Sequence, residues 1–248
     1  MAKLIAQGKA MECKVVVFDK DGTLIDSRLV LLELAKARME SVRNNLAEKD
    51  AALWEKIVGV DLKRGRIDYG GPLATMPRRE EILVAASAFY LNGRSWSEAK
   101  RLAQKAYDNA DDSMKPPYGS VLLEGVAEAL KRLKNGGLKL TVASTDGHKR
   151  ITESLKALGV APLFDAVVGV DDVVNGKPSP DMIFEVMKKT RAEANEVVMV
   201  GDSTVDMLLG RNANIRACVG VLTGFTSREK LERVADAVVS SVAELNVS

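Results

Sequence analysis

Polar side chains follow four short apolar runs of the sequence, at the point where each run ends. In chain order they are Asp19 and Asp21; Ser144, Thr145 and Asp146; Asp171, Asp172 and Lys177; and Asp202 and Asp206. Ligands of open parallel sheets bind beyond the carboxyl ends of the strands. If the four runs are strands of one such sheet, their ends supply one rim with carboxylates, a hydroxyl group and a lysine.

The groups on this rim are those that phosphoryl transfer requires. That reaction needs a nucleophile, an acid for the leaving alcohol and positive charge against the phosphoryl oxygens. A carboxylate nucleophile repels a phosphate dianion unless charge is neutralised. Mg²⁺ held by further carboxylates would neutralise it in a shell of hard oxygen ligands. Lys177 and the Ser144 hydroxyl would complete a cradle for the phosphate.

Strand and helix patterns alternate around these positions. The β-branched run at residues 14–18 is typical of a buried strand, and further strands are expected at 138–143, 166–170, 196–200, 217–221 and 238–239. Helical patterns separate them at 125–135, 149–158, 180–189, 205–212 and 226–234. This alternation predicts a Rossmann-like α/β core of three layers, with a parallel sheet covered on both faces.

The stretch from residue 28 to residue 114 has a different pattern. Apolar residues recur at helical spacing over 29–46, 50–58, 79–91 and 97–110, with almost no strand signal. The segment KPPYG at 115–119 then breaks the chain. We expect an all-helical domain over residues 28–114, inserted into a core formed by residues 1–27 and 115–248.

Composition excludes several classes of function. The 248 residues carry a net charge of +2 and only 4% aromatic residues, which argues against nucleic acid as a partner. The N-terminus lacks the apolar core of a signal peptide, and the longest uncharged run, 82–93, is too short to span a bilayer. We therefore expect a cytoplasmic protein without a membrane partner. Cys13 and Cys218 adjoin apolar runs and are expected to be buried free thiols.

Four segments resemble the motifs of the haloacid dehalogenase superfamily, and they occur in the order of that family. They are DKDGTL at 19–24, Ser144 after the run 140–143, GKPSPD at 176–181 and GDSTVD at 201–206. A lone DxDGT match is only moderately specific, whereas the ordered set of four is a strong signal. The insertion after the first motif is similar to the helical cap of phosphoglycolate phosphatases, sugar phosphatases and β-phosphoglucomutase.

The resemblance implies a role for each site residue. Asp19 would be the nucleophile and a Mg²⁺ ligand, and Asp21 the acid and base, with its carbonyl oxygen on Mg²⁺. The remaining roles fall to Thr23 for loop geometry, Ser144 (or its neighbour Thr145) and Lys177 for the phosphoryl oxygens, Asp202 for Mg²⁺ and Asp206 for support of the metal. The reaction implied is hydrolysis of a small-molecule phosphate ester, of the phosphoglycolate or sugar phosphate type, through a phospho-aspartate. The cap would close over the site and read the leaving group.

Structural explanations compete with these roles. Asp19 and Asp21 could be turn residues, Lys177 a solvated lysine and Ser144 a helix N-cap, and Asp206 could be an acid favourable to a helix dipole. The ordered motifs favour function in each case.

Several other polar residues receive no catalytic role. Asp171 and Asp172 are expected to shape a loop, and no role is assigned to the only histidine, His148. The insert's Lys63, Arg64 and Arg66 could contact an anionic substrate, but a solvated loop is slightly preferred. Lys20 stands where many capped members carry an apolar residue, and its side chain is expected at the cap interface or in solvent.

Other functions are compatible with the same fold. A phosphomutase would share every core residue, and a phosphonatase would recruit a cap lysine, for which Lys36 and Lys63 are candidates. A dehalogenase has no need of Asp21, so that residue argues against it. A non-enzymatic phospho-receiver module also has an acceptor Asp, a Lys and acidic ligands, but the long helical insert and Asp21 count against it.

Overall fold

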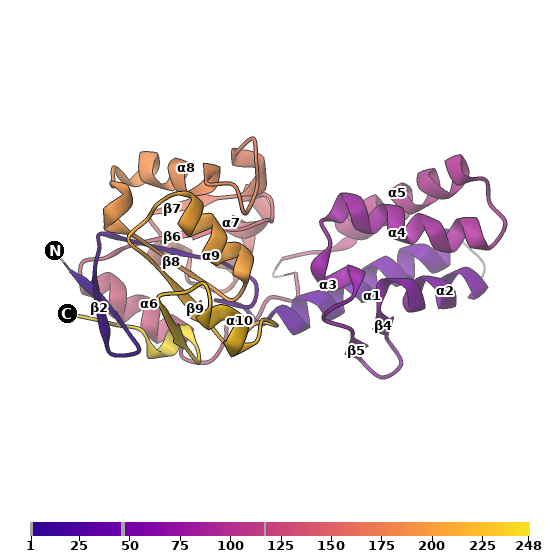
Figure 1. Cartoon of the computed structure of the whole chain (residues 1–248). Coiled ribbons are helices and arrows are strands. Elements are labelled where there is room, and N and C mark those ends of the chain that lie inside the picture. Colours follow the sequence, from indigo (N-terminus) through magenta and orange to yellow (C-terminus); the bar gives the residue numbers. More distant parts are fainter. Residues whose placement is uncertain (1, 46–47, 117) are drawn as a thin grey trace. The chain divides into compact units, whose positions relative to one another are not determined.

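The computed structural model describes residues 2–45, 48–116 and 118–248. The chain divides into two compact units, one of Met1–Ser27 with Ser120–Ser248 and one of Arg28–Gly119 (Figure 1). The first unit contains every residue of the four motifs, so it holds the candidate site.

The first unit is built on a six-stranded sheet with the strand order β10-β9-β8-β3-β6-β7. Its strands are β3 (Val15–Phe18), β6 (Lys139–Ala143), β7 (Ala166–Val168), β8 (Val197–Gly201), β9 (Ala217–Val221) and β10 (Ala237–Val239). All neighbouring pairs are parallel. The strands therefore end at one edge of the sheet, as the alternating pattern predicts.

Helices cover this sheet, and the predicted α/β fold class is confirmed (Figure 1). They are α6 (Val126–Asn135), α7 (His148–Ala157), α8 (Asp181–Thr190), α9 (Thr204–Asn212) and the short α10 (Arg228–Glu232). Val15 and Val17 of β3 pack in one apolar cluster with residues of α8, α9 and α10. Every residue of β3 is buried, which is the pattern of a strand covered on both faces.

A small antiparallel sheet, which the sequence patterns did not predict, joins the two ends of the chain. It has the order β11-β1-β2 and comprises β1 (Lys3–Ala6), β2 (Lys9–Glu12) and β11 (Asn246–Val247). These strands are short and partly exposed, so they lack the continuous apolar run that marks β3.

Cys13 and Cys218 are buried free thiols, as predicted, and burial raises their pKa values to about 11 and about 12.

The second unit is mainly helical. It comprises α1 (Ser27–Asn45, which begins at the last residue of the first unit), α2 (Glu48–Val58), α3 (Pro72–Thr75), α4 (Arg78–Leu91) and α5 (Trp96–Ser113). The end of the helix predicted at 29–46 lies outside the described residues. The expectation of an all-helical insert is corrected by a hairpin of β4 (Val60–Asp61) and β5 (Arg66–Ile67). Its strands of two residues are too short to give a periodic signal.

A buried polar network joins four helices of this unit. Arg38 of α1 forms an ion pair with Glu81 of α4, and the Tyr107 hydroxyl of α5 donates to Glu81 Oε1 at 2.7 Å. Trp54 Nε1 of α2 donates to the Tyr107 oxygen at 3.3 Å. Burial raises the pKa of Glu81, although the Arg38 charge opposes that shift. A buried charge without its partner is costly, so loss of any one partner would leave an uncompensated group between these helices. No helix among the described residues has the length and apolar character needed to cross a membrane.

Candidate active site

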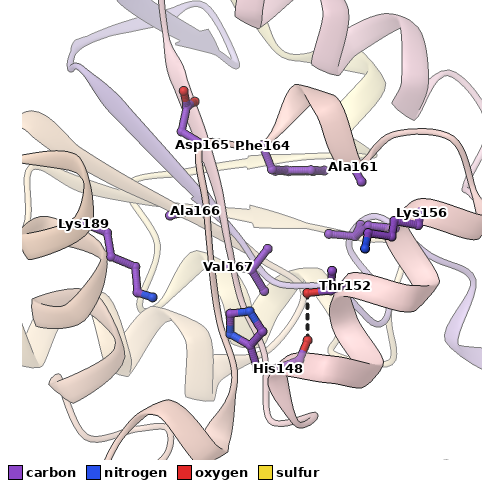
Figure 2. Close-up of a pocket in the computed structure, with 10 residues that line it drawn as sticks. His148, Thr152, Lys156, Ala161, Phe164, Asp165, Ala166, Val167 and Lys189 are labelled. Carbon is purple, nitrogen blue, oxygen red and sulfur yellow. Dashed lines mark hydrogen bonds between the residues drawn. The ribbon is translucent and has the colours of Figure 1, made fainter.

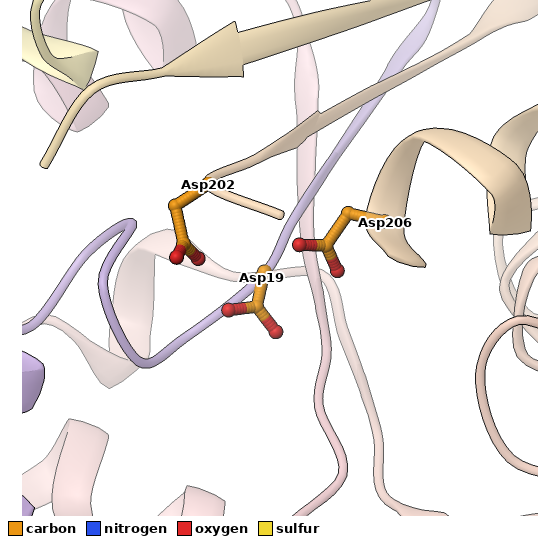
Figure 3. A group of neighbouring side chains, drawn as sticks. All are labelled: Asp19, Asp202 and Asp206. Atoms are coloured by element: carbon orange, nitrogen blue, oxygen red, sulfur yellow. The ribbon is translucent and has the colours of Figure 1, made fainter. Parts of the chain in front are cut away.

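Three carboxylates meet at the ends of the central strands. Asp19 follows β3 directly, Asp202 follows β8, and Asp206 lies in the first turn of α9 (Figure 3). One carboxylate oxygen from each lies within 4.8 Å of the others. The register explains this meeting, because Phe18 at the end of β3 pairs with Val200 of β8, and the Asp19 N–H donates to Val200 O at 2.9 Å.

Lys177 connects two of these carboxylates. Its Nζ lies 2.5 Å from Asp19 Oδ1 and 2.6 Å from Asp206 Oδ1, and its side chain is only 3% exposed. Burial alone would lower the pKa of Lys177, but the Asp19 and Asp206 carboxylates outweigh burial and hold that pKa above its ordinary value. Lys177 is therefore a charged group of the cluster, and the alternative of a solvated lysine is wrong.

The cluster contains more negative charge than its lysine can balance. Burial, together with the Asp206 and Asp21 charges, raises the pKa of Asp19 to about 7 in spite of Lys177. Burial and the charges of Asp19 and Asp206 also raise the pKa of Asp202 well above its ordinary value. Three buried carboxylates beside one ammonium group form a set of hard oxygen donors, which suits a divalent cation such as Mg²⁺.

The Asp206 carboxylate both caps helix α9 and contacts Lys177 of the site. Its Oδ2 accepts hydrogen bonds from the Ser203 hydroxyl at 2.5 Å and the Ser203 N–H at 3.1 Å, and the Asp206 N–H donates to Ser203 Oγ at 3.2 Å. This reciprocal capping box starts α9. Because the box uses Oδ2, Oδ1 is left to face Lys177.

The loop after β3 fits closely against Asp202. Thr23 is fully buried and its hydroxyl lies 3.3 Å from Asp202 Oδ1. Gly22 has a φ of +82°, and a Cβ atom there would lie 2.8 Å from the Asp202 carboxylate. Position 22 therefore excludes a side chain on both conformational and steric grounds.

Ser144 and Thr145 follow the next strand, β6. Ser144 is buried, its N–H donates to Val168 O at 3.1 Å, and its Oγ accepts the Asp146 N–H at 3.2 Å. Thr145 is exposed. Among the residues that the structure describes, the cluster of carboxylates that could hold a metal ion consists of Asp19, Asp202 and Asp206. It includes neither the Asp21 side chain nor any side chain of the loop after β6.

The expected position of Lys20 is wrong. Its side chain is 1% exposed and lies within the first unit, where Nζ contacts both carboxylate oxygens of Asp21 and Oδ2 of Asp146. Burial would lower the pKa of Lys20, but the charges of Asp21 and Asp146 raise it. The DxD motif does not predict where the side chain between the two acids lies. That side chain contacts Asp146, which belongs to a loop distant in sequence.

Asp171 and Asp172 shape a loop, as predicted. Asp171 Oδ1 accepts the His148 N–H at 2.7 Å, and Asp172 Oδ2 accepts the Gly169 N–H at 2.8 Å. Asp172 Oδ2 also lies 2.7 Å from His148 Nδ1.

A surface pocket of about 570 Å³ lies beside β7 (Figure 2). His148, Thr152, Lys156 and Lys189 are among its lining residues, whereas Asp19, Lys177 and Asp202 are not. His148 thus belongs to the surroundings of this pocket.

The loop after β9 adds two residues that sequence reasoning missed. The Thr223 hydroxyl donates to Gly22 O at 2.6 Å. Gly224 lies so close to Asp202 that a Cβ atom there would be 1.8 Å from Asp202 Oδ2. The strand at 217–221 was predicted, but the residues beyond its end carry no charge. The signal that could have found them is their position at a fifth strand end.

Gly224→Ala is expected to reduce turnover by about a hundredfold, because the added methyl group must displace the Asp202 carboxylate and small misplacements at a reacting centre have effects of this size. Turnover of a phosphate ester, the substrate class that the resemblance of the motifs implies, measures the effect under saturating conditions. Gly70→Ala is the matched control, since its new methyl group would meet only Asp68 Oδ1, at 3.4 Å. Wild-type turnover in Gly224→Ala would show that Asp202 has room to move.

Known proteins share this architecture over nearly the whole chain. The model of the family described as haloacid dehalogenase-like hydrolase matches residues 16–220. The chain is 30% identical over 212 residues to pyrophosphatase PpaX from Halalkalibacterium halodurans, with 84% of each chain covered. It is 28% identical over 237 residues to phosphoglycolate phosphatase from Mesorhizobium japonicum, covering 96% of this chain and 95% of the relative.

A solved structure shows the same fold. It is a HAD-superfamily hydrolase of subfamily IA from Geobacter sulfurreducens, which is 22% identical, has a TM-score of 0.60 and covers 94% of both chains. Because the family model matches more than half of this chain, the chain belongs to the haloacid dehalogenase-like hydrolase family. The resemblance of the four motifs is thereby confirmed.

Proposed function

We propose that this hydrolase is a Mg²⁺-dependent phosphatase, which hydrolyses a small-molecule phosphate monoester through a phospho-aspartate formed on Asp19. One observation carries the proposal: Asp19 lies buried in a group with Asp202 and Asp206, and a buried lysine contacts its carboxylate. A carboxylate held next to other carboxylates and a lysine is suited to attack an anionic phosphorus centre once further positive charge is present.

The residues that would hold Mg²⁺ are Asp19 and Asp202 through their carboxylates and Asp21 through its carbonyl oxygen, with Asp206 in support. The clustering of the Asp19, Asp202 and Asp206 carboxylates is the structural reason to place a cation here. The parts of the Asp21 carbonyl oxygen and of Asp206 are those that the resemblance of the motifs implies. When bound, the cation supplies the positive charge that lets an anionic nucleophile approach an anionic phosphate.

The chain's own groups then divide the reaction into two displacements. Asp19 attacks phosphorus, and the bond from phosphorus to the leaving oxygen breaks while Asp21 gives that oxygen a proton. In the second step Asp21 takes a proton from water, the water oxygen attacks phosphorus, and the bond to Asp19 breaks to release phosphate. Lys177 and the Ser144 hydroxyl hold the phosphoryl oxygens, with Thr145 as the neighbouring alternative to Ser144.

We further propose that residues 28–114 form a cap domain and that residues 1–27 and 115–248 form the catalytic core. Caps of this class supply the contacts to the leaving group, so the substrate would be selected by residues of the helical insert.

Phosphate release from a panel of esters tests the function. The panel contains phosphoglycolate, hexose phosphates, a nucleotide and p-nitrophenyl phosphate, with Mg²⁺ present. Pyrophosphate is added because one relative is named a pyrophosphatase. We expect release from at least one monoester, and preference for phosphoglycolate or a sugar phosphate. Failure to hydrolyse every monoester would contradict the proposal.

A further inference from the structure

We propose that Lys20 is a positioning residue that holds the acid and base Asp21 in register with the loop of Ser144. This inference rests on the proposed function, because it assigns Lys20 a role through Asp21. The juxtaposition that carries it is a buried ammonium group placed between Asp21 and Asp146 at the ends of two neighbouring strands.

Lys20 fixes an otherwise mobile side chain. The Asp21 side chain is 33% exposed, and a side chain that solvent reaches exchanges rotamers readily unless a contact holds it. Lys20 Nζ lies 2.8 Å from Asp21 Oδ1 and 2.7 Å from Oδ2, so it contacts both oxygens at once. Because the lysine is itself buried, its position is set by packing, and it defines where the Asp21 carboxylate rests.

Asp146 provides the second contact of the same ammonium group. Asp146 Oδ2 lies 3.0 Å from Lys20 Nζ and also 3.5 Å from Arg150 Nε of α7. Burial would raise the pKa of Asp146, but the charges of Lys20 and Arg150 lower it. A buried lysine is tolerated only when its charge is compensated, and these two carboxylates compensate it.

The link continues to the proposed phosphate cradle. The Asp146 N–H donates to Ser144 Oγ at 3.2 Å, and β3 and β6 are neighbours with Phe18 paired to Val142. Lys20 therefore connects the loop that carries Asp19 and Asp21 to the loop that carries Ser144. Proton transfer requires the donor within hydrogen-bond reach of the leaving oxygen, so an error in this connection would affect the proton-transfer step first.

The choice of leaving group separates positioning of the acid from general support of the fold. Phenyl phosphate and p-nitrophenyl phosphate have similar shapes, but phenolate is the stronger base and depends more on protonation as it leaves. Because Asp21 also serves the second step, which is the same for both esters, the comparison uses kcat/KM, which reports formation of the phospho-aspartate. We expect Lys20→Met to lower kcat/KM for phenyl phosphate by on the order of 10²-fold and for p-nitrophenyl phosphate by less than about threefold. Lys20→Arg, which keeps the charge, should restore most of the loss.

Asp146→Asn gives an independent variant in case Lys20→Met does not fold. It should reproduce the selective loss on phenyl phosphate in weaker form, and the double variant should be no slower than Lys20→Met alone. Thermal unfolding of each variant records its stability. An equal loss in kcat/KM on the two esters would show that Lys20 only supports the fold, and wild-type values on both would remove any role.

Asp19→Asn separates failure of this inference from failure of the proposed function. If Asp19→Asn keeps turnover, the proposed mechanism is wrong whatever Lys20 does. If Asp19→Asn is inactive while Lys20→Met lowers kcat/KM equally for both esters, the mechanism stands and the positioning role of Lys20 is overturned.

Discussion

Asp19→Asn is expected to abolish phosphate release, with a loss in kcat on the order of 10⁴-fold or more, as is usual when a nucleophile is removed. The amide cannot form the phospho-aspartate. It also withdraws a negative charge from the position that Lys177 Nζ contacts at 2.5 Å. Folding should survive the change, because the cluster of Asp19, Asp202 and Asp206 holds more carboxylates than its lysine can balance. Phosphate release, thermal unfolding and mass spectrometry of acid-quenched enzyme measure the three parts of this expectation.

Asp108→Asn is a suitable control for the same chemical change. Asp108 is exposed and forms an ion pair with Arg78 in the helical unit, and surface pairs of this kind contribute little to stability. Only the wild type and this control should yield a phosphorylated species. Turnover in Asp19→Asn near the wild-type rate would refute Asp19 as the nucleophile.

Removal of divalent cations is the second change with a large expected effect. Treatment with EDTA should lower turnover by on the order of 10³-fold, since a metal ion supplies several kcal/mol of charge stabilisation and each 1.36 kcal/mol corresponds to about tenfold in rate. Addition of Mg²⁺ should restore it. This loss is expected because Asp19, Asp202 and Asp206 form a cluster of buried carboxylates. Lys177 contacts Asp19 and Asp206, and a bound cation would add to the positive charge that this lysine supplies.

A readout other than activity makes this test independent of the substrate. Mg²⁺ that binds the folded protein raises its melting temperature, and NaCl at equal ionic strength controls for screening. Asp202→Asn should reduce that rise because it removes one of the proposed ligands. Full turnover in EDTA, or an equal rise with NaCl, would contradict a metal site in this cluster.

The parts of the fold that local patterns determine could be predicted from the sequence. The β-branched run of β3 and the alternation of helices and strands after it predicted the parallel sheet, and all six strands are present. The same reasoning predicted that Asp19 and Asp202 lie at adjacent strand ends, because parallel neighbours end at one edge. The order of the four motifs then indicated which loops at that edge carry the site residues.

What could not be predicted depends on contacts between loops distant in sequence. Lys20 lies between two acids in sequence, yet one of the carboxylates that its ammonium group contacts is that of Asp146, which belongs to another loop. Gly224 was missed because its importance is the absence of a side chain beside Asp202, and spacing along the chain gives no sign of that approach. The hairpin of β4 and β5 has too few residues for a period to show.

The central place of β3 has a consequence for how the enzyme assembles. Val15 of β3 pairs with Lys139 on one side and with Val197 on the other, so both neighbours of this strand come from late in the chain. The helical unit, by contrast, is one continuous segment, Arg28–Gly119. Pairings that span so much chain must overcome a large loop-closure entropy before they stabilise anything. During synthesis Asp19, the proposed nucleophile, therefore leaves the ribosome well before Lys177, Asp202 and Asp206, and it can meet them only after the intervening chain has followed.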